Sequence, residues 1–200
     1  MAPGELDLVV IGGSAGSLEV LLEILPALPA DLPVAVAIVL HLMPTAPSLV
    51  WQLLGAHCRL PVREVEDKEP ICAGTIYVAP PNYHLLIERH GAFALAVDAP
   101  VNFSRPSIDV LFGSAAHVYG ARCAGLLLSG ANDDGAEGLE RIHRAGGATF
   151  VQDPATASSD TMPQAALRRL GTAARVLTIP SIASVVSIIA GATIRPGTRP

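Results

Sequence analysis

Short apolar runs alternate with longer, more polar segments along most of the chain. The runs at residues 6–11, 34–40 and 125–129 are nearly continuous, which is typical of strands buried on both faces of a parallel sheet. Residues 17–27 instead place Leu at helical spacing on one face. We therefore predict an α/β fold, in which helices cover both faces of a mainly parallel, doubly wound sheet in three layers.

The same pattern places the remaining elements. Further short strands are expected at residues 62–65, 75–79, 148–152 and 175–178. Further helices are expected at residues 48–56, 106–119 (with Pro106 in the first turn), 135–145, 163–170 and after Pro180. Residues 85–88 and 92–97 predict an antiparallel hairpin at one edge of the sheet. No linker divides the chain, so we expect a single domain over residues 1–195.

Composition and charge exclude several classes of protein. With 50% hydrophobic and 16% charged residues, the chain is globular. The net charge of −5, without a basic stripe, does not indicate a nucleic-acid partner. Cys58, Cys72 and Cys123 are odd in number and lack a C-x-x-C pair, so we expect buried free thiols and neither a disulfide nor a metal site. No residue pattern indicates a cofactor.

The chain ends carry no targeting signal that we recognise. Residues 1–5 are not a basic segment leading into a long apolar one, so no signal peptide is expected. The most apolar stretch, residues 179–194, is interrupted by serines and is shorter than a membrane span. It predicts a buried terminal helix, and the protein is expected to be cytoplasmic.

A glycine-rich loop, Gly12-Gly13-Ser14-Ala15-Gly16, follows the first predicted strand. Its G-x-S-x-G pattern, on a strand-to-helix turn, presents a serine as a nucleophile, although such turns also bind phosphate. Ile11 breaks the dinucleotide fingerprint, and the second strand ends in His41 rather than an acidic residue. No lysine follows the glycines as in a phosphate-binding loop. Nucleotide binding is therefore disfavoured.

Three chemically matched groups follow strand ends. Ser14 follows the first strand, His41 follows the second, and Asn132, Asp133 and Asp134 follow the strand ending at Ser129. The carboxyl ends of parallel strands meet at one rim, so a nucleophile, a base and an orienting acid are expected there.

Each of these residues also has a structural interpretation. Ser14 could cap the next helix, and His41 could be a packing residue. Asp134, three residues before Glu137, could be a helix N-cap, unless Asn132 or Asp133 takes that place. The remaining histidines lack metal-ligand spacing and are expected to be surface or packing residues: His57, His84, His90, His117 and His143.

Several stretches together resemble the catalytic domain of the chemotaxis protein-glutamate methylesterases (the CheB type). They occur in the family's order over nearly the whole chain, at residues 10–16, 39–44, 76–81, 101–102, 105–112, 128–136 and 162–163. The resemblance implies hydrolysis of glutamyl methyl esters on chemoreceptors and often deamidation of receptor glutamines. It assigns the triad to Ser14, His41 and Asp134, an order that differs from that of an α/β-hydrolase.

The resemblance also implies further site residues and partners. The backbone N–H groups of Ala15 and Ala131 would form the oxyanion hole, and Asn102 and Arg105 would contact substrate. The partners implied are the methylated cytoplasmic regions of transmembrane chemoreceptors, together with a separate receiver or methyltransferase protein. Members of the family typically carry an N-terminal receiver domain, and we expect none here because Met1 lies only a few residues before the first predicted strand.

This sequence departs from the family pattern near the serine and near the aspartate. Ala15 and Ser17 stand where threonine and glycine are usual, and Ala131-Asn132 replaces the usual Met-Gly. Backbone donors survive such changes, whereas side-chain support of the site and fit to the substrate need not. The alternative to an active esterase is a binding or regulatory module that kept the fold and weakened the chemistry.

Overall fold

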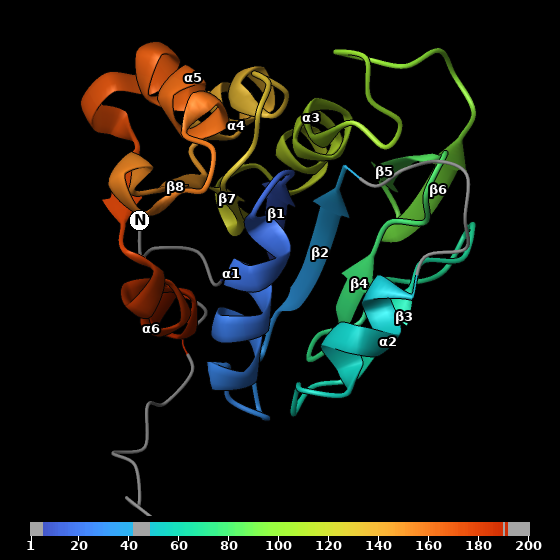
Figure 1. Ribbon diagram of the computed structural model, residues 1–200. Helices are drawn as coiled ribbons and strands as arrows, with labels where there is room; N and C mark the ends of the chain where they lie inside the picture. The colour runs from blue at the N-terminus through green and yellow to red at the C-terminus, as the bar shows by residue number, and fades with distance from the viewer. Residues whose placement is uncertain (1–5, 42–48, 190, 192–200) are drawn as a thin grey trace, which may run out of the picture.

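A computed structural model describes residues 6–41, 49–189 and 191. Its centre is a seven-stranded parallel sheet in the order β3-β4-β2-β1-β7-β8-β9 (Figure 1). The strands are β1 Leu8–Gly13, β2 Ala35–Leu40, β3 Val62–Glu64, β4 Ile76–Val78, β7 Cys123–Leu127, β8 Ala148–Gln152 and β9 Arg175–Leu177. The predicted α/β class and the parallel sheet are confirmed.

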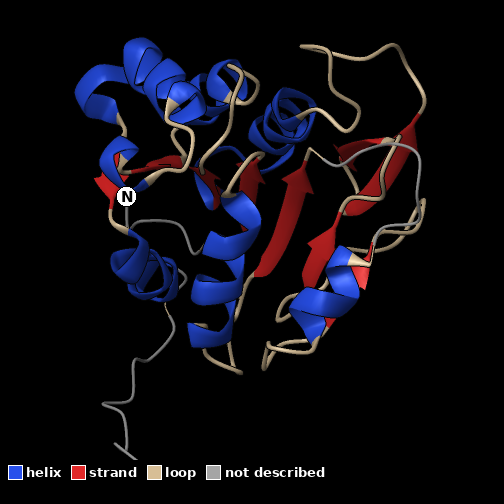
Figure 2. Ribbon diagram, in the orientation of Figure 1, coloured by secondary structure: helices blue, strands red, loops and turns tan. Residues whose placement is uncertain are grey.

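Helices cover both faces of this sheet (Figure 2). They are α1 Ser17–Ile24, α2 Val50–Gly55, α3 Ile108–Tyr119, α4 Ala136–Arg144, α5 Thr161–Leu170 and α6 Ile179–Ile189. Alternate residues of β1 face opposite sides: Val10 packs with α3, α4 and α5, whereas Ile11 packs with α1, α2 and α6. Both faces are therefore apolar, which explains the continuous hydrophobic runs of the central strands.

The antiparallel pair β5 His84–Glu88 and β6 Ala92–Ala96 forms a sheet of its own, rather than continuing the large sheet by hydrogen bonds. It lies beside β4 in Figure 1 and packs on α3. Leu85 and Phe93 join the core under α3, and the Phe93 ring lies 4.8 Å from that of Tyr77 on β4. Apolar packing attaches the hairpin, together with backbone hydrogen bonds between β6 and residues 68–71, which follow β3.

Some element boundaries differ from expectation. β1 extends through Gly12 and Gly13, so the glycine loop begins inside the strand. Pro106 is not in the first turn of α3, which begins at Ile108. Three expectations from the sequence fall outside the described residues. They are the start of a helix at Ser48, the family motif at Leu42–Pro44 and the end of a helix at residues 192–194. Within the described chain, no helix has the length and apolarity to cross a membrane.

Candidate active site

The ends of β1, β2 and β7 meet at one rim, as the sequence predicted. Gly13 pairs with Leu40 in the parallel register of β1 and β2, so Ser14 and His41 each follow a paired residue. The His41 N–H donates to the Gly13 carbonyl at 3.1 Å, and the Ser14 N–H donates to the Ser129 carbonyl beyond β7 at 2.9 Å. Backbone hydrogen bonds therefore hold the start of the serine loop between the histidine and the loop that leads to Asp134.

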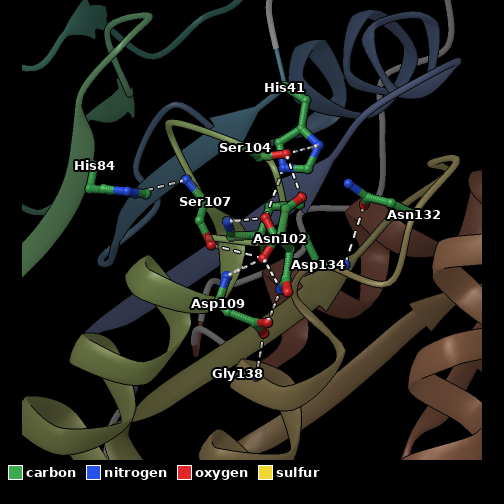
Figure 3. Close-up of polar contacts among 10 residues, drawn as sticks. His41, His84, Asn102, Ser104, Ser107, Asp109, Asn132, Asp134 and Gly138 are labelled. Carbon is green, nitrogen blue, oxygen red and sulfur yellow. Dashed lines mark hydrogen bonds and ion pairs between the residues drawn. The ribbon is translucent and has the colours of Figure 1, made fainter. Parts of the chain in front are cut away.

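His41 and Asp134 form a direct pair across this rim (Figure 3). The Nε2 atom of His41 lies 2.8 Å from Oδ2 of Asp134, whose side chain is fully buried. An ionised carboxylate only accepts hydrogen bonds, so Nε2 carries the proton and Nδ1 of the neutral ring is the basic nitrogen. The Ser104 hydroxyl lies 3.4 Å from Nδ1, at the long limit of a hydrogen bond.

Asp134 is anchored to the N-terminus of α3 and does not cap its own helix. Its carboxylate accepts from the N–H groups of Ile108 at 2.7 Å and Asp109 at 3.2 Å, and from the Ser107 hydroxyl at 2.8 Å. The N-cap of α4 is Gly135, without a side-chain cap. Asp134 thus satisfies the free N–H groups and the dipole of a different helix, which the spacing to Glu137 could not indicate.

Two glycines allow the end of α3 to approach the strand ends this closely. A Cβ atom on Gly12 would lie 2.2 Å from Cγ2 of Ile108, and one on Gly135 would lie 2.6 Å from the same atom. The Ile108 side chain therefore packs between the end of strand β1 and the start of α4. This packing brings the first N–H groups of α3 to the carboxylate.

Asn102 and Asp109 extend the network on the far side of Asp134. The Asn102 amide nitrogen donates to Oδ1 of Asp134 at 3.1 Å and to Oδ2 of Asp109 at 2.8 Å. The other oxygen of Asp109 accepts from the Gly138 N–H at 2.6 Å. One amide therefore bridges two carboxyl groups and uses both of its hydrogens (Figure 3).

These contacts move the two carboxyl pKa values in opposite directions. Burial alone would raise the pKa of Asp134, but hydrogen bonds from His41, Ile108, Ser107 and Asn102 outweigh it and lower that pKa below its usual value. For Asp109, burial raises the pKa to about 6, with repulsion from Asp134 and Glu137 adding to it. Asp134 is therefore the acid that stays ionised.

The two residues expected to contact substrate have internal partners. Asn102 binds the two carboxyl groups described above. The Arg105 guanidinium donates to Oδ1 of Asn82 at 2.7 and 3.1 Å and to the carbonyls of Val97 and Asp98 at 2.9 and 3.0 Å. Arg105 therefore fixes the loop that precedes α3, and contact with substrate stays a prediction for both residues.

The serine side of the site is more open. Ser14 is partly exposed, and both Ala15 and Ala131 are exposed. Within the described part of the chain, Ser14 forms hydrogen bonds through its backbone N–H and carbonyl groups. The Ser17 hydroxyl donates to the Ser14 carbonyl at 2.5 Å, and the Ser129 hydroxyl donates to the Ala15 carbonyl at 2.7 Å. Two carbonyls of the loop are thus held by hydroxyl groups of the protein.

Sequence reasoning missed Ser104, Ser107 and Asp109 as parts of the site. All three lie in the stretch from Val101 to α3, and Ser107 did carry a helix N-cap signal, although its partner is the distant Asp134. The buried His84 is a packing residue as expected: it accepts from the Ser107 N–H and contacts the Ala99 carbonyl. The cysteine expectation was wrong in part, because only Cys123 is buried and Cys72 is exposed.

Comparison with known proteins gives consistent matches. The model of the family described as CheB methylesterase matches residues 9–186. A putative protein-glutamate methylesterase/protein-glutamine glutaminase of Leptospira interrogans is 45% identical over 161 residues, which cover 80% of this chain and 83% of that protein. Protein-glutamate methylesterase/protein-glutamine glutaminase 1 of Anaeromyxobacter dehalogenans is 42% identical over 185 residues, covering 92% of this chain but only 52% of that protein.

A solved structure agrees with these relatives. The crystal structure of the Thermotoga maritima CheB methylesterase catalytic domain superposes with a TM-score of 0.86 and 29% identity, and the match covers 90% of this chain and 97% of that one. The rim described above lies within the matched range. The family model spans most of the chain, and several relatives exceed 40% identity. The chain therefore belongs to the CheB methylesterase family.

Proposed function

We propose that this protein is a serine hydrolase that removes methyl esters from glutamate side chains of chemoreceptors and also deamidates receptor glutamines. Ser14 is the nucleophile, His41 the general base and Asp134 the orienting acid, within a catalytic domain over residues 1–195. The observation that carries the proposal is the His41–Asp134 pair, which leaves Nδ1 as the basic nitrogen at the rim that Ser14 shares. Relatives named for this activity support the choice of substrate.

The reaction follows from the atoms at this rim. Ser14 Oγ attacks the ester carbonyl carbon while Nδ1 of His41 takes its proton, and Asp134 stabilises the imidazolium. The N–H groups of Ala15 and Ala131 bind the oxyanion. Methanol leaves with the proton from His41, or ammonia does so when the substrate is a glutamine. Water, deprotonated by His41, then hydrolyses the glutamyl-serine ester to a carboxylate and restores Ser14.

Ser104 supplies a second hydroxyl near Nδ1, so the assignment of the nucleophile needs a direct test. Ser104 lies on the segment before α3 and contacts the ring at 3.4 Å. Ser14 precedes α1 by three residues, and helix N-termini can bind an anion. The first N–H groups of α3, after Ser104, instead donate to Asp134. We therefore assign attack to Ser14 and give Ser104 no role in bond formation.

Partners follow from the proposed substrate. The esterified glutamates belong to the methylated cytoplasmic regions of transmembrane receptors, so the protein acts in the cytoplasm at the membrane surface. A separate receiver or methyltransferase protein is the second proposed partner.

The test measures methanol release from methylated receptor membranes. The wild-type chain is compared with Ser14→Ala and, as a matched control, Ser104→Ala. We expect Ser14→Ala to lose on the order of 10⁴-fold or more in kcat and Ser104→Ala to lose less than about tenfold. A fluorophosphonate probe should label the wild type and Ser104→Ala with one-to-one stoichiometry, and should not label Ser14→Ala.

The other outcomes separate the alternatives. Activity that persists in Ser14→Ala but not in Ser104→Ala would move the nucleophile to Ser104. A folded wild type that neither labels nor releases methanol would support the binding module. Turnover of small esters without action on receptors would indicate a different carboxylic ester hydrolase.

A further inference from the structure

A tight turn from Val101 to Ser104 contains two residues that contact the catalytic pair, Asn102 and Ser104. Val101 and Ser104 exchange backbone hydrogen bonds, with N···O distances of 3.1 and 2.9 Å. Asn102 and Phe103 between them have φ values of 50° and 61°. Positive φ at both central positions is the pattern of a type I′ turn, where Asn and Gly are favoured. Asn102 fits this rule, but Phe103 does not.

Phe103 is costly at this position for two reasons. Left-handed backbone costs an aromatic residue about 1–2 kcal/mol, and the side chain is fully exposed, with a relative accessibility of 103%. The ring therefore contributes no burial to the described fold. Strain and apolar exposure at one residue indicate a function outside the folding of the chain itself.

The turn is held rigidly beside the reacting groups. The preceding residue, Asn102, donates to Asp134, and the following residue, Ser104, contacts His41. Arg105 ties the same loop to the carbonyls of Val97 and Asp98. The Phe103 ring therefore projects into solvent, while its two neighbours in the chain contact the catalytic pair: Asn102 contacts Asp134 and Ser104 contacts His41.

We propose that Phe103 is an anchor for the polypeptide of the protein substrate, an inference that rests on the proposed function. A receptor segment whose glutamyl ester reaches His41 must pass this turn, and the apolar residues that flank the ester would cover the Phe103 ring. Val101, which begins the same turn, is 37% exposed and is also apolar. Aromatic residues, Phe included, are enriched in the buried core of protein–protein interfaces relative to the rest of the surface. A free amino-acid ester is too small to cover this ring.

The test compares two substrates in the full chain: methylated receptor membranes and a small N-acyl glutamate γ-methyl ester. Phe103→Gly removes the ring and fits the positive φ, so the turn is retained. We expect kcat/KM on the receptor to fall about 10- to 100-fold more than kcat/KM on the small ester. Phe103→Tyr should stay within about threefold of wild type, because it keeps the aromatic face.

Val176→Ala is the matched control, since Val176 is 48% exposed on the edge strand β9, away from the rim. It should not change the ratio of the two kcat/KM values. Sedimentation of the Ser14→Ala chain with receptor membranes, with and without Phe103→Gly, measures binding apart from chemistry and should show weaker binding of the double variant.

Two negative results would have different meanings. In the first, the wild type cleaves the receptor ester and Phe103→Gly lowers kcat/KM equally for both substrates or for neither. The proposed anchoring role of Phe103 is then wrong, and the proposed function stands. If the wild type hydrolyses only the small ester and does not sediment with receptor membranes, the receptor is not the substrate, and both proposals are overturned.

Discussion

The two sides of His41 are built differently. On the acid side, Asp134 is fully buried and receives hydrogen bonds from His41, Asn102, Ser107 and the first two N–H groups of α3. On the nucleophile side, Ser14 is partly exposed and Ala15 and Ala131 are exposed. A buried carboxylate must be hydrogen-bonded, which the acid side achieves. Under the proposed function, the acid side contributes to stability and to catalysis together, and the more exposed serine side contributes to catalysis.

The largest effect is expected from Asp134→Ala. The change removes the acceptor for several buried donors, and each unsatisfied donor costs about 1–3 kcal/mol. We expect the unfolding free energy to fall by about 3 kcal/mol or more and kcat to fall about 10⁴-fold, because His41 loses its orienting partner. Urea unfolding and methanol release measure the two effects.

Ser14→Ala is the counterpart on the open side. It should lose a comparable factor in kcat and change the unfolding free energy by less than about 0.5 kcal/mol, as expected for a partly exposed hydroxyl away from the core. Equal loss of stability in the two variants would contradict the division between the two sides of His41.

A smaller effect is expected from Asn102→Gly, which keeps the positive φ of the turn and removes the amide that bridges Asp134 and Asp109. Asp134 keeps four of its donors, so we expect kcat to fall about 10- to 100-fold on receptor and small ester alike. The equal loss distinguishes Asn102 from Phe103, whose removal should affect the receptor selectively. A loss confined to the receptor would place Asn102 in substrate binding instead.

The sequence was a good guide to what the strands position and a poor guide to what the helices add. Parallel strands bring their carboxyl ends together, which predicts Ser14, His41 and the stretch Asn132 to Asp134 at one rim. The choice of Asp134 within that stretch rests on the family resemblance. Asp109 joins the hydrogen-bond network of Asp134 only because the neighbouring Ile108 fits between Gly12 and Gly135. The contact between Ile108 and Gly12 joins residues more than 90 positions apart. No local pattern near Asp109 indicates that contact.

The hairpin teaches the same lesson at the level of the fold. Its two strands were recognisable from alternation and the Arg89-His90-Gly91 turn. Its attachment combines the packing of Leu85 and Phe93 in the core under α3 with backbone hydrogen bonds to residues 68–71. Both depend on side chains and segments that meet only in the folded chain.

Asp109 should leave a signature in the pH dependence of stability. Its folded pKa of about 6 lies above its usual 3.8, so its stabilising contribution is complete below about pH 4 and is lost as pH rises through 6. After allowance for solvent screening of this half-buried group, the loss is about 1–2 kcal/mol. Urea unfolding of the wild type and of Asp109→Asn between pH 4 and 7 should show this slope in the wild type alone.

Asp134 has the opposite sign and provides an internal check. Its pKa is lowered in the fold, so its contribution is present above pH 4 and is lost only as pH falls further. A decline of stability with rising pH that is identical in Asp109→Asn would assign the titration to another group.

The smallest effect is expected from Ser17→Ala, because Ser17 holds the serine loop by one hydrogen bond to the Ser14 carbonyl. Its buried hydroxyl donates to the Ser14 carbonyl at 2.5 Å and so fixes the peptide that ends at the Ala15 N–H. Ser17→Ala should cost about 1 kcal/mol in unfolding free energy and a few-fold in kcat, because one hydrogen bond is lost and the oxyanion donor is held less firmly. Ser181→Ala serves as the control, because it also removes a hydroxyl that donates to a carbonyl three residues earlier, away from the serine loop.

The kinetic constants of Ser17→Ala distinguish two roles. A fall in kcat with KM unchanged would place the loss in the transition state. A change in KM alone would show that Ser17 supports substrate binding and that catalysis does not need its hydrogen bond to the serine loop.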